Sequence, residues 1–175
     1  MFYKTTYKAL TGKITLASDG KNLCGLWNGN HKYIYTNMEQ KDDLRIFNDT
    51  EKWLDRYYAG EKPNFKELPL APRGSDFRQA VWQTLCDIPY GEVVTYGDIA
   101  KIMAKKLGKE KMSAQAIGGA VGHNPISIII PCHRVVGSNG SLTGFGGGIK
   151  IKVKLLEHEG IDMSRFFIPT KGTAL

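Results

Sequence analysis

IIIPCHRV, at residues 128–135, is the stretch of this chain that points most directly to its chemistry. Its apolar, β-branched run is expected to be buried, and the proline ends that run directly before Cys132, with His133 and Arg134 beside it. A free thiol has a pKa of about 8.5 and becomes a good nucleophile once a base or a positive charge favours the thiolate. The pattern therefore indicates a rigid platform that holds a reactive thiol beside a base. The alternative is a buried structural cysteine, the commoner fate of a free Cys.

Upstream of this stretch, the sequence predicts two short helices joined by a tight basic loop. TYGD at 95–98 has the form of a capping box and begins a helix over about 96–107, which is expected to bury Ile102 among others. Ser113 is the expected N-cap of a second helix that runs to about His123. This arrangement fits a helix-turn-helix.

The second helix carries an unusual number of small residues: Ala116, Gly118, Gly119 and Ala120. Glycine costs roughly 1 kcal/mol of stability in a helix interior. Its use here suggests that the backbone of this helix lies close to a neighbour. A closely packed helix is one candidate for that neighbour. DNA is the other, because a smooth and narrow helix also fits a minor groove.

Downstream, a last helix is expected from about Ile149 to Gly160, which would be its C′ residue. Its three lysines, Lys150, Lys152 and Lys154, are expected to form a solvated face, with contact to phosphate as the alternative.

Five further motifs flank the central stretch in a fixed order. They are FRQAVW at 77–82, GEVVTY at 91–96, GHNP at 122–125, GFGGG at 144–148 and LLEHEG at 155–160. Together with PCHRV they resemble the O6-alkylguanine-DNA alkyltransferases, also called methylated-DNA–protein-cysteine methyltransferases, and the match extends from Pro72 to Gly160. The resemblance implies repair by direct reversal: a guanine alkylated at O6, or a thymine alkylated at O4, is flipped out of duplex DNA and gives its alkyl group irreversibly to Cys132.

Alkyl transfer needs a soft nucleophile and a means of removing its proton. Cys132 supplies the thiol and His133 is the natural base, but neighbours in an extended segment point to opposite sides, so a bridging water is needed. Glu159 could hold the far ring nitrogen and stabilise the imidazolium. The resemblance implies the same relay, from Glu159 to His133 and through water to Cys132. Asn124 is expected to brace the turn before the cysteine, or simply to end the helix before Pro125.

The resemblance also implies which residues meet the base and the DNA. Tyr96 would donate its hydroxyl to the guanine ring, although on its own it would be interpreted as ordinary packing. Backbone groups around Cys132, Val135 and Gly146 would read the base edge, Phe145 would wall the pocket, and Gln115, Ala116, Gly118 and Gly119 would face the minor groove. A flipped base costs a few kcal/mol of unstacking.

Three positions depart from the family pattern. Gln115 stands where the family usually has an intercalating arginine, which leaves the efficiency of DNA binding and flipping open. Phe145 stands where many relatives have tyrosine, and Gly146 where some have serine. These two changes are expected to give the loop more freedom, and they leave open whether a roomier pocket accepts bulkier alkyl groups.

The bulk composition fits an intracellular DNA-binding protein. The 175 residues are 42% hydrophobic with a net charge of +7; residues 1–70 hold 11 basic and 9 acidic side chains, and residues 71–175 hold 13 and 8. A basic C-terminal half is the footprint of a phosphate-backbone binder. No apolar run approaches the roughly 20 residues that span a bilayer, and the N-terminus lacks the apolar core of a secretory signal. We therefore expect the protein in the cytoplasm, or in the nucleus of a eukaryote, with no membrane partner. It is also expected to be a monomer.

The cysteines and histidines predict neither disulfides nor a metal site. Cys24, Cys86 and Cys132 form no CxxC pair, which fits a reducing compartment, and the scattered histidines lack zinc-ligand spacing. Cys86 is expected to be a small core residue. No metal and no cofactor is predicted, because the resemblance implies that the alkylated DNA itself is the donor.

The fold class expected is α/β in the broad sense (α+β), with two domains. Short β-rich runs at 2–10, 14–17, 23–27 and 32–35 predict an antiparallel sheet. A helix over 41–58 is expected to follow, with a possible break or N-cap at 48–50. The resemblance implies that this N-terminal α/β domain, residues 1–70, supports a mainly helical winged-helix or helix-turn-helix domain, residues 71–175.

Three other functions compete with repair. A non-enzymatic alkyltransferase-like protein would bind lesions without a cysteine, and the intact PCHR argues against it. A winged-helix regulator would need base-reading side chains, which the second helix lacks apart from Gln115. A cysteine hydrolase with a Cys-His-Glu set would turn over many times, whereas an alkyltransferase acts once.

Overall fold

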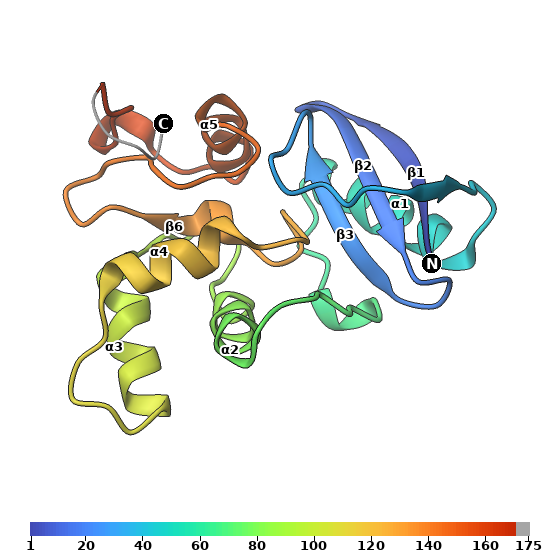
Figure 1. The fold of residues 1–175 in the computed structure, drawn as a ribbon. Coiled ribbons are helices and arrows are strands. Elements are labelled where there is room, and N and C mark those ends of the chain that lie inside the picture. The colour runs from blue at the N-terminus through green and yellow to red at the C-terminus, as the bar shows by residue number, and fades with distance from the viewer. Residues whose placement is uncertain (171–175) are drawn as a thin grey trace.

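The structure, a computed structural model, describes residues 1–170. A sheet-containing N-terminal half lies beside a mainly helical C-terminal half (Figure 1). The expected fold class is confirmed. The domain boundary at residue 70 stays a prediction, and residues 171–175 of the second expected domain lie outside the described residues.

The N-terminal half contains a four-stranded sheet in the order β3-β2-β1-β4. β1 (Phe2–Ala9), β2 (Gly12–Ser18) and β3 (Leu23–Asn28) are antiparallel, and β4 (Met38–Gln40) pairs parallel with β1. The strand expected at 32–35 is wrong, because residues 29–37 form a loop. The aromatic residues that suggested a strand there pack instead: the Tyr35 ring lies 4.8 Å from that of Trp27.

One helix, α1 (Arg45–Tyr58), packs its buried residues against this sheet. The break expected at 48–50 is wrong. Thr50 continues the helix because its hydroxyl donates to the carbonyl of Ile46 at 2.7 Å, which satisfies the polar side chain inside the helix. A 3₁₀ helix, Phe65–Glu67, leads toward the C-terminal half.

Up to residue 170, the C-terminal half contains four α-helices and a short parallel strand pair. Its elements are α2 (Asp76–Leu85), β5 (Val94–Thr95), α3 (Tyr96–Lys106), α4 (Ala114–Gly122), a 3₁₀ helix (Cys132–Arg134), β6 (Val135–Val136), α5 (Ile149–His158) and a 3₁₀ helix (Met163–Arg165). The expected caps at Thr95 and Ser113 are confirmed, and Thr95 forms the capping box with Asp98. The burial expected for Ile102 is wrong: it is 42% exposed, because the inward stripe of α3 runs through Ile99 and Met103.

The two halves share a backbone seam directly before the central cysteine. In β3, Leu26 donates its N–H to the carbonyl of Pro125 at 2.8 Å and accepts from the N–H of Ser127 at 3.0 Å. The largest buried apolar cluster likewise draws residues from both halves. The segment that leads to Cys132 is therefore fastened to the edge of the N-terminal sheet.

Within residues 1–170, none of the helices combines the length and the apolar character needed to cross a lipid bilayer.

Candidate active site

Two tight turns present Cys132. The N–H of Ile129 donates to the carbonyl of Ser127 at 2.8 Å around Ile128, whose φ is +71°, and this is a γ-turn. The N–H of Cys132 donates to the carbonyl of Ile130 at 2.8 Å around Pro131 (φ −81°, ψ 64°), an inverse γ-turn. A positive φ at a β-branched residue costs of order 1–3 kcal/mol, so the surrounding packing must hold it.

The local conformation differs from the expected one in one respect. The run of isoleucines is buried as expected. However, Cys132 and His133 lie in a 3₁₀ turn rather than in an extended segment. The two γ-turns reverse the chain and leave no room for a strand.

Asn124 braces these turns from the end of α4. Its side-chain amide donates to the carbonyl of Ile130 at 2.8 Å, and its oxygen accepts from the N–H of Ile126 at 3.0 Å. Asn124 is buried, so both contacts lie away from water. It therefore both follows the helix and ties the two ends of the turn together.

The thiol of Cys132 is buried and protonated at rest. Burial raises its pKa, and the side chain of Asn124 and the positive charge of Lys152 oppose that rise. The residue is 5% exposed. A thiol in this environment needs a base before it can act as a nucleophile.

His133 has the tautomer of such a base. Its Nε2 lies 2.7 Å from Oε1 of Glu159, and because an ionised carboxylate only accepts, Nε2 carries the proton. Burial lowers the pKa of His133, which leaves the ring neutral near pH 7. Nδ1 contacts no hydrogen-bonding group among the described residues, so its lone pair is free to accept a proton.

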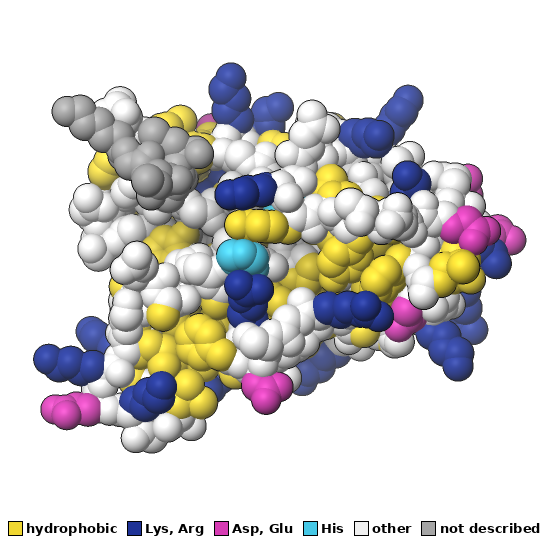
Figure 2. Space-filling model, in the orientation of Figure 1, with side chains coloured by type: hydrophobic (Ala, Val, Ile, Leu, Met, Phe, Trp, Pro, Cys, Tyr) yellow, Lys and Arg dark blue, Asp and Glu magenta, His cyan; other side chains and the backbone are white. Residues whose placement is uncertain are grey.

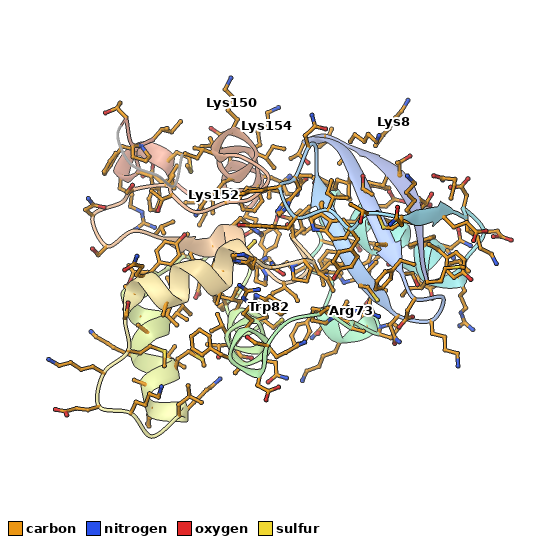
Figure 3. The ribbon with its side chains drawn as sticks, in the orientation of Figure 1. Lys8, Arg73, Trp82, Lys150, Lys152 and Lys154 are labelled. Carbon is orange, nitrogen blue, oxygen red and sulfur yellow. The ribbon has the colours of Figure 1, made fainter. Side chains whose placement is uncertain are left out.

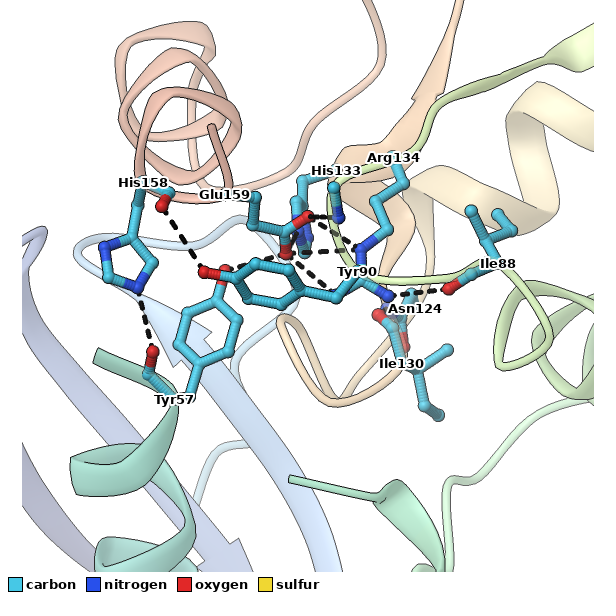
Figure 4. Close-up of polar contacts among 10 residues, drawn as sticks. Tyr57, Ile88, Tyr90, Asn124, Ile130, His133, Arg134, His158 and Glu159 are labelled. Atoms are coloured by element: carbon cyan, nitrogen blue, oxygen red, sulfur yellow. Dashed lines mark hydrogen bonds and ion pairs between the residues drawn. The ribbon is translucent and has the colours of Figure 1, made fainter. Parts of the chain in front are cut away.

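Glu159 receives hydrogen bonds from four different residues (Figure 4). Tyr57 Oη donates to Oε1 at 2.9 Å, Arg134 Nη2 to Oε1 at 2.8 Å, Arg134 Nε to Oε2 at 2.9 Å, and the Gly91 N–H to Oε2 at 3.2 Å, in addition to His133. Burial would raise the pKa of this carboxyl, but His133 and Arg134 hold it well below its usual range. The carboxylate is therefore ionised and saturated with donors.

The end of α5 sets the position of this carboxylate. The helix ends as expected at Gly160, whose φ is +81°. The N–H of Ile161 donates to the carbonyl of Leu156 at 3.1 Å and that of Gly160 to Glu157 at 2.9 Å, a Schellman motif. This places Glu159 at the C-cap.

The solvated face expected for the three lysines of α5 is wrong at Lys152. Figure 3 shows Lys150 and Lys154 pointing away from the molecule and Lys152 pointing inward. Lys152 is fully buried and donates to the carbonyls of Val135 at 2.6 Å and Thr143 at 2.8 Å. Burial lowers its pKa to about 8, and Cys132 opposes that shift.

Sequence reasoning missed three residues of this site: Lys152, Arg134 and Tyr57. A signal existed for Lys152, which lies three residues after Ile149 and four before Leu156, on the inward stripe of α5. Arg134 follows the histidine directly, but nothing local indicates that its guanidinium turns toward Glu159. Tyr57 lies in the other half of the chain and had no signal at all.

The structure gives Tyr96 a different partner from the expected one. Its hydroxyl donates to the carbonyl of Thr143 at 2.7 Å. The carbonyl of Val135 is likewise occupied by Lys152. Phe145 is buried, as a pocket wall would be. A flipped base that accepts from the Tyr96 hydroxyl therefore has to displace the hydrogen bond between that hydroxyl and the carbonyl of Thr143.

Gly146 lies close to the N-terminal half. A Cβ at this position would lie 2.2 Å from Nε2 of His31, a buried residue of the 29–37 loop. The space that a serine would occupy is thus filled by His31 of the N-terminal half. The greater freedom expected for the loop stays a prediction.

The candidate DNA surface is the exposed side of α4. Gln115, Ala116 and Gly119 are exposed and Gly118 lies against the Tyr96 ring, whereas Ala120 is buried and its carbonyl accepts from Trp82 Nε1 at 2.8 Å. The smooth surface expected of this helix therefore excludes Ala120. Figure 2 shows that the surface over α4 carries few charged side chains and that Lys and Arg side chains stand around it.

No group of three or more His, Cys, Asp or Glu side chains that could hold a metal ion occurs among residues 1–170.

Comparison with known proteins gives matches over both halves of the chain. Residues 2–72 match the 6-O-methylguanine DNA methyltransferase, ribonuclease-like domain, and residues 76–161 match the DNA binding domain of the same family. A methylated-DNA–protein-cysteine methyltransferase of Haemophilus influenzae is 41% identical over 160 residues, 91% of this chain and 87% of that protein. One of Methanosarcina acetivorans is also 41% identical, over 90% of this chain and 98% of that protein.

Solved structures agree with these matches. The Mycobacterium tuberculosis O6-methylguanine methyltransferase is 40% identical, with a TM-score of 0.79 over 98% of this chain and 97% of that one. The crystal structure of Mycobacterium tuberculosis OGT in complex with DNA is 41% identical, with a TM-score of 0.79 over 94% of each chain.

Proposed function

Because the chain belongs to the 6-O-methylguanine DNA methyltransferase family, we propose that it repairs duplex DNA by moving the alkyl group of O6-alkylguanine to Cys132 in a single, irreversible turnover. The observation that carries this proposal is the buried set Cys132, His133 and Glu159. The thiol of Cys132 is protonated, and the imidazole of the next residue is neutral, bonded to Glu159 at Nε2 and free at Nδ1. O4-alkylthymine is a second substrate of the same chemistry. We place the activity with the DNA, in the cytoplasm or in a eukaryotic nucleus.

The first step is removal of the thiol proton. His133 accepts it at Nδ1 through a water molecule, because no direct hydrogen bond joins the ring to Cys132. Glu159 then stabilises the imidazolium through the hydrogen bond at Nε2. Lys152 lowers the cost of the thiolate, since its ammonium group favours the charged form of Cys132.

The second step is displacement at carbon. The thiolate electron pair forms the new S–C bond while the C–O6 bond breaks, and the guanine ring keeps the electrons of that bond. The hydroxyl of Tyr96 delivers a proton to the ring, which lets the base leave neutral. The product is a thioether and an intact guanine, so each protein molecule acts once.

Access requires that the base leave the helix. Cys132 is too deeply buried to reach a stacked guanine. The exposed face of α4 suits the minor groove, with Gln115 near its start to fill the gap left by the flipped base. Phe145 and the backbone of Val135 and Gly146 form the expected walls of the base pocket.

Intact-mass measurement tests the proposal. The protein is mixed with an excess of duplex that contains one O6-methylguanine. A gain of one methylene group per molecule, absent in Cys132→Ser, is the expected result. Unchanged mass with DNA still bound would indicate a lesion-binding protein, and unchanged mass without DNA binding would overturn the proposal.

A further inference from the structure

We infer that Tyr57, a residue of the N-terminal half, is a positioning residue that limits the negative charge Glu159 offers to His133 and so sets the strength of that base. The inference deepens the proposed function and rests on His133 as the proton acceptor. It gives the N-terminal half a part in the chemistry beyond mechanical support.

Tyr57 is fixed at the end of α1 by contacts with its own helix and with the C-terminal half. Its side chain is 1% exposed. Its carbonyl accepts from Nε2 of His158 at 2.8 Å, and its ring packs against those of Trp53 and Tyr90 at 5.8 and 5.9 Å. The ring therefore has one orientation, and that orientation carries the hydroxyl to Glu159.

The hydroxyl meets the same oxygen that His133 uses. Oε1 of Glu159 accepts from Tyr57 at 2.9 Å, from His133 at 2.7 Å and from Arg134 Nη2 at 2.8 Å. Each donor withdraws some of the charge on Oε1 that would otherwise stabilise an imidazolium. The other charged groups that act on His133 are Arg134 and Lys152, and both oppose its protonation. In the proposed function Cys132, the preceding residue, gives His133 the proton.

The balance matters because a base that is too strong is already protonated. Without the Tyr57 hydroxyl, Oε1 would attract the imidazolium more strongly and the pKa of His133 would rise. A larger share of His133 would then hold a proton before the substrate arrives, and could not take one from Cys132. Tyr57 keeps the ring neutral while Glu159 still orients it.

The test is a titration of the His133 ring by NMR, together with the pH dependence of the methyl-transfer rate. In Tyr57→Phe we expect the His133 midpoint and the acidic limb of the rate to move up together, by about 0.3 to 1 pH unit. Tyr58→Phe is the matched control: it lies next in the same helix, and its hydroxyl contacts that of Thr11 at 2.7 Å. We expect it to leave both curves unchanged.

A second variant should shift the His133 midpoint and the acidic limb of the rate in the opposite direction. Fluorotyrosine at position 57 has a more acidic hydroxyl and is a stronger donor, so both curves should move down. A merely structural role would not give opposite shifts. Curves for both variants that coincide with those of the unmodified protein would overturn the inference. The titration needs no substrate, so it decides the role of Tyr57 even if the protein took up no methyl group, a result that would instead overturn the proposed function.

Discussion

The two halves of this molecule differ in how much of their contribution to the site can be recognised from the sequence. Residues 71–170 contain each residue that the sequence singled out for the site, and residues 1–70 contain none. In the structure, however, the N-terminal half touches that site at three points: Tyr57 at Glu159, His31 at Gly146, and Leu26 at the segment before Cys132. The reacting groups belong to a local sequence motif, whereas several residues that hold them in place are distant from that motif in the sequence.

Glu159→Gln removes the carboxylate that joins Tyr57 of the N-terminal half to Arg134. We expect this substitution to have the largest effect on the free energy of unfolding. It leaves the guanidinium of Arg134 buried without its anion, which costs about 3–5 kcal/mol at pH 7. The pKa of Glu159 is lowered in the folded protein, so its contribution is present above the unfolded pKa and is lost as the pH falls. Urea unfolding should therefore show a difference from wild type that shrinks in acid.

Glu157→Gln, at an exposed position of α5, is the control and should change little at any pH. A Glu159→Gln deficit that stays constant from about pH 7 to pH 3 would contradict the linkage.

Gly146→Ala tests the contact between His31 of the N-terminal half and the loop at Gly146. The new methyl group would clash with His31, so we expect a loss of about 1–3 kcal/mol and a slower methyl transfer. His31→Ala in the same chain should relieve the clash. A double-mutant cycle in urea measures the coupling, and additive effects would show that the N-terminal half does not constrain the loop.

Gln115→Arg should have the smallest effect on the protein itself. The position is exposed, so the free energy of unfolding should change by less than about 0.5 kcal/mol. A new phosphate contact should steepen the salt dependence of DNA binding by about one unit of the log–log slope. Gln40→Arg, an exposed site in β4, adds the same charge to the other half. Equal slopes in both variants would show that α4 is not the DNA surface.

Local patterns explain what the sequence could predict. Thr95 and Ser113 cap their helices because a cap depends on residues two or three positions away. The Gly160 end of α5 follows from the same kind of signal, and so does the burial of the isoleucines before Cys132.

What the sequence could not predict depends on distant contacts. The γ-turn at Ile128 forms only because its flanks bond to β3 and to Asn124, and β-branched composition alone favours a strand. Lys152 is buried because two carbonyls from other segments receive its ammonium group. Tyr57 reaches Glu159 across 102 positions of sequence. The composition of residues 32–35 predicts a strand that does not form for the same reason, since their aromatic rings serve tertiary packing.

The most direct test of the account is to locate the transferred methyl group by fragmentation of the reacted protein. We predict that Cys132 carries it and that Cys24 and Cys86 carry none, although all three are free thiols. Burial raises the pKa of all three thiols, and a positive charge opposes that rise at each: Arg73 at Cys24, Arg134 at Cys86 and Lys152 at Cys132. Cys132 differs because the side chain of Asn124 also opposes the rise through a hydrogen bond. A methyl group found on Cys24 or Cys86, or on no cysteine while the guanine is restored, would contradict the assignment of Cys132 as the acceptor.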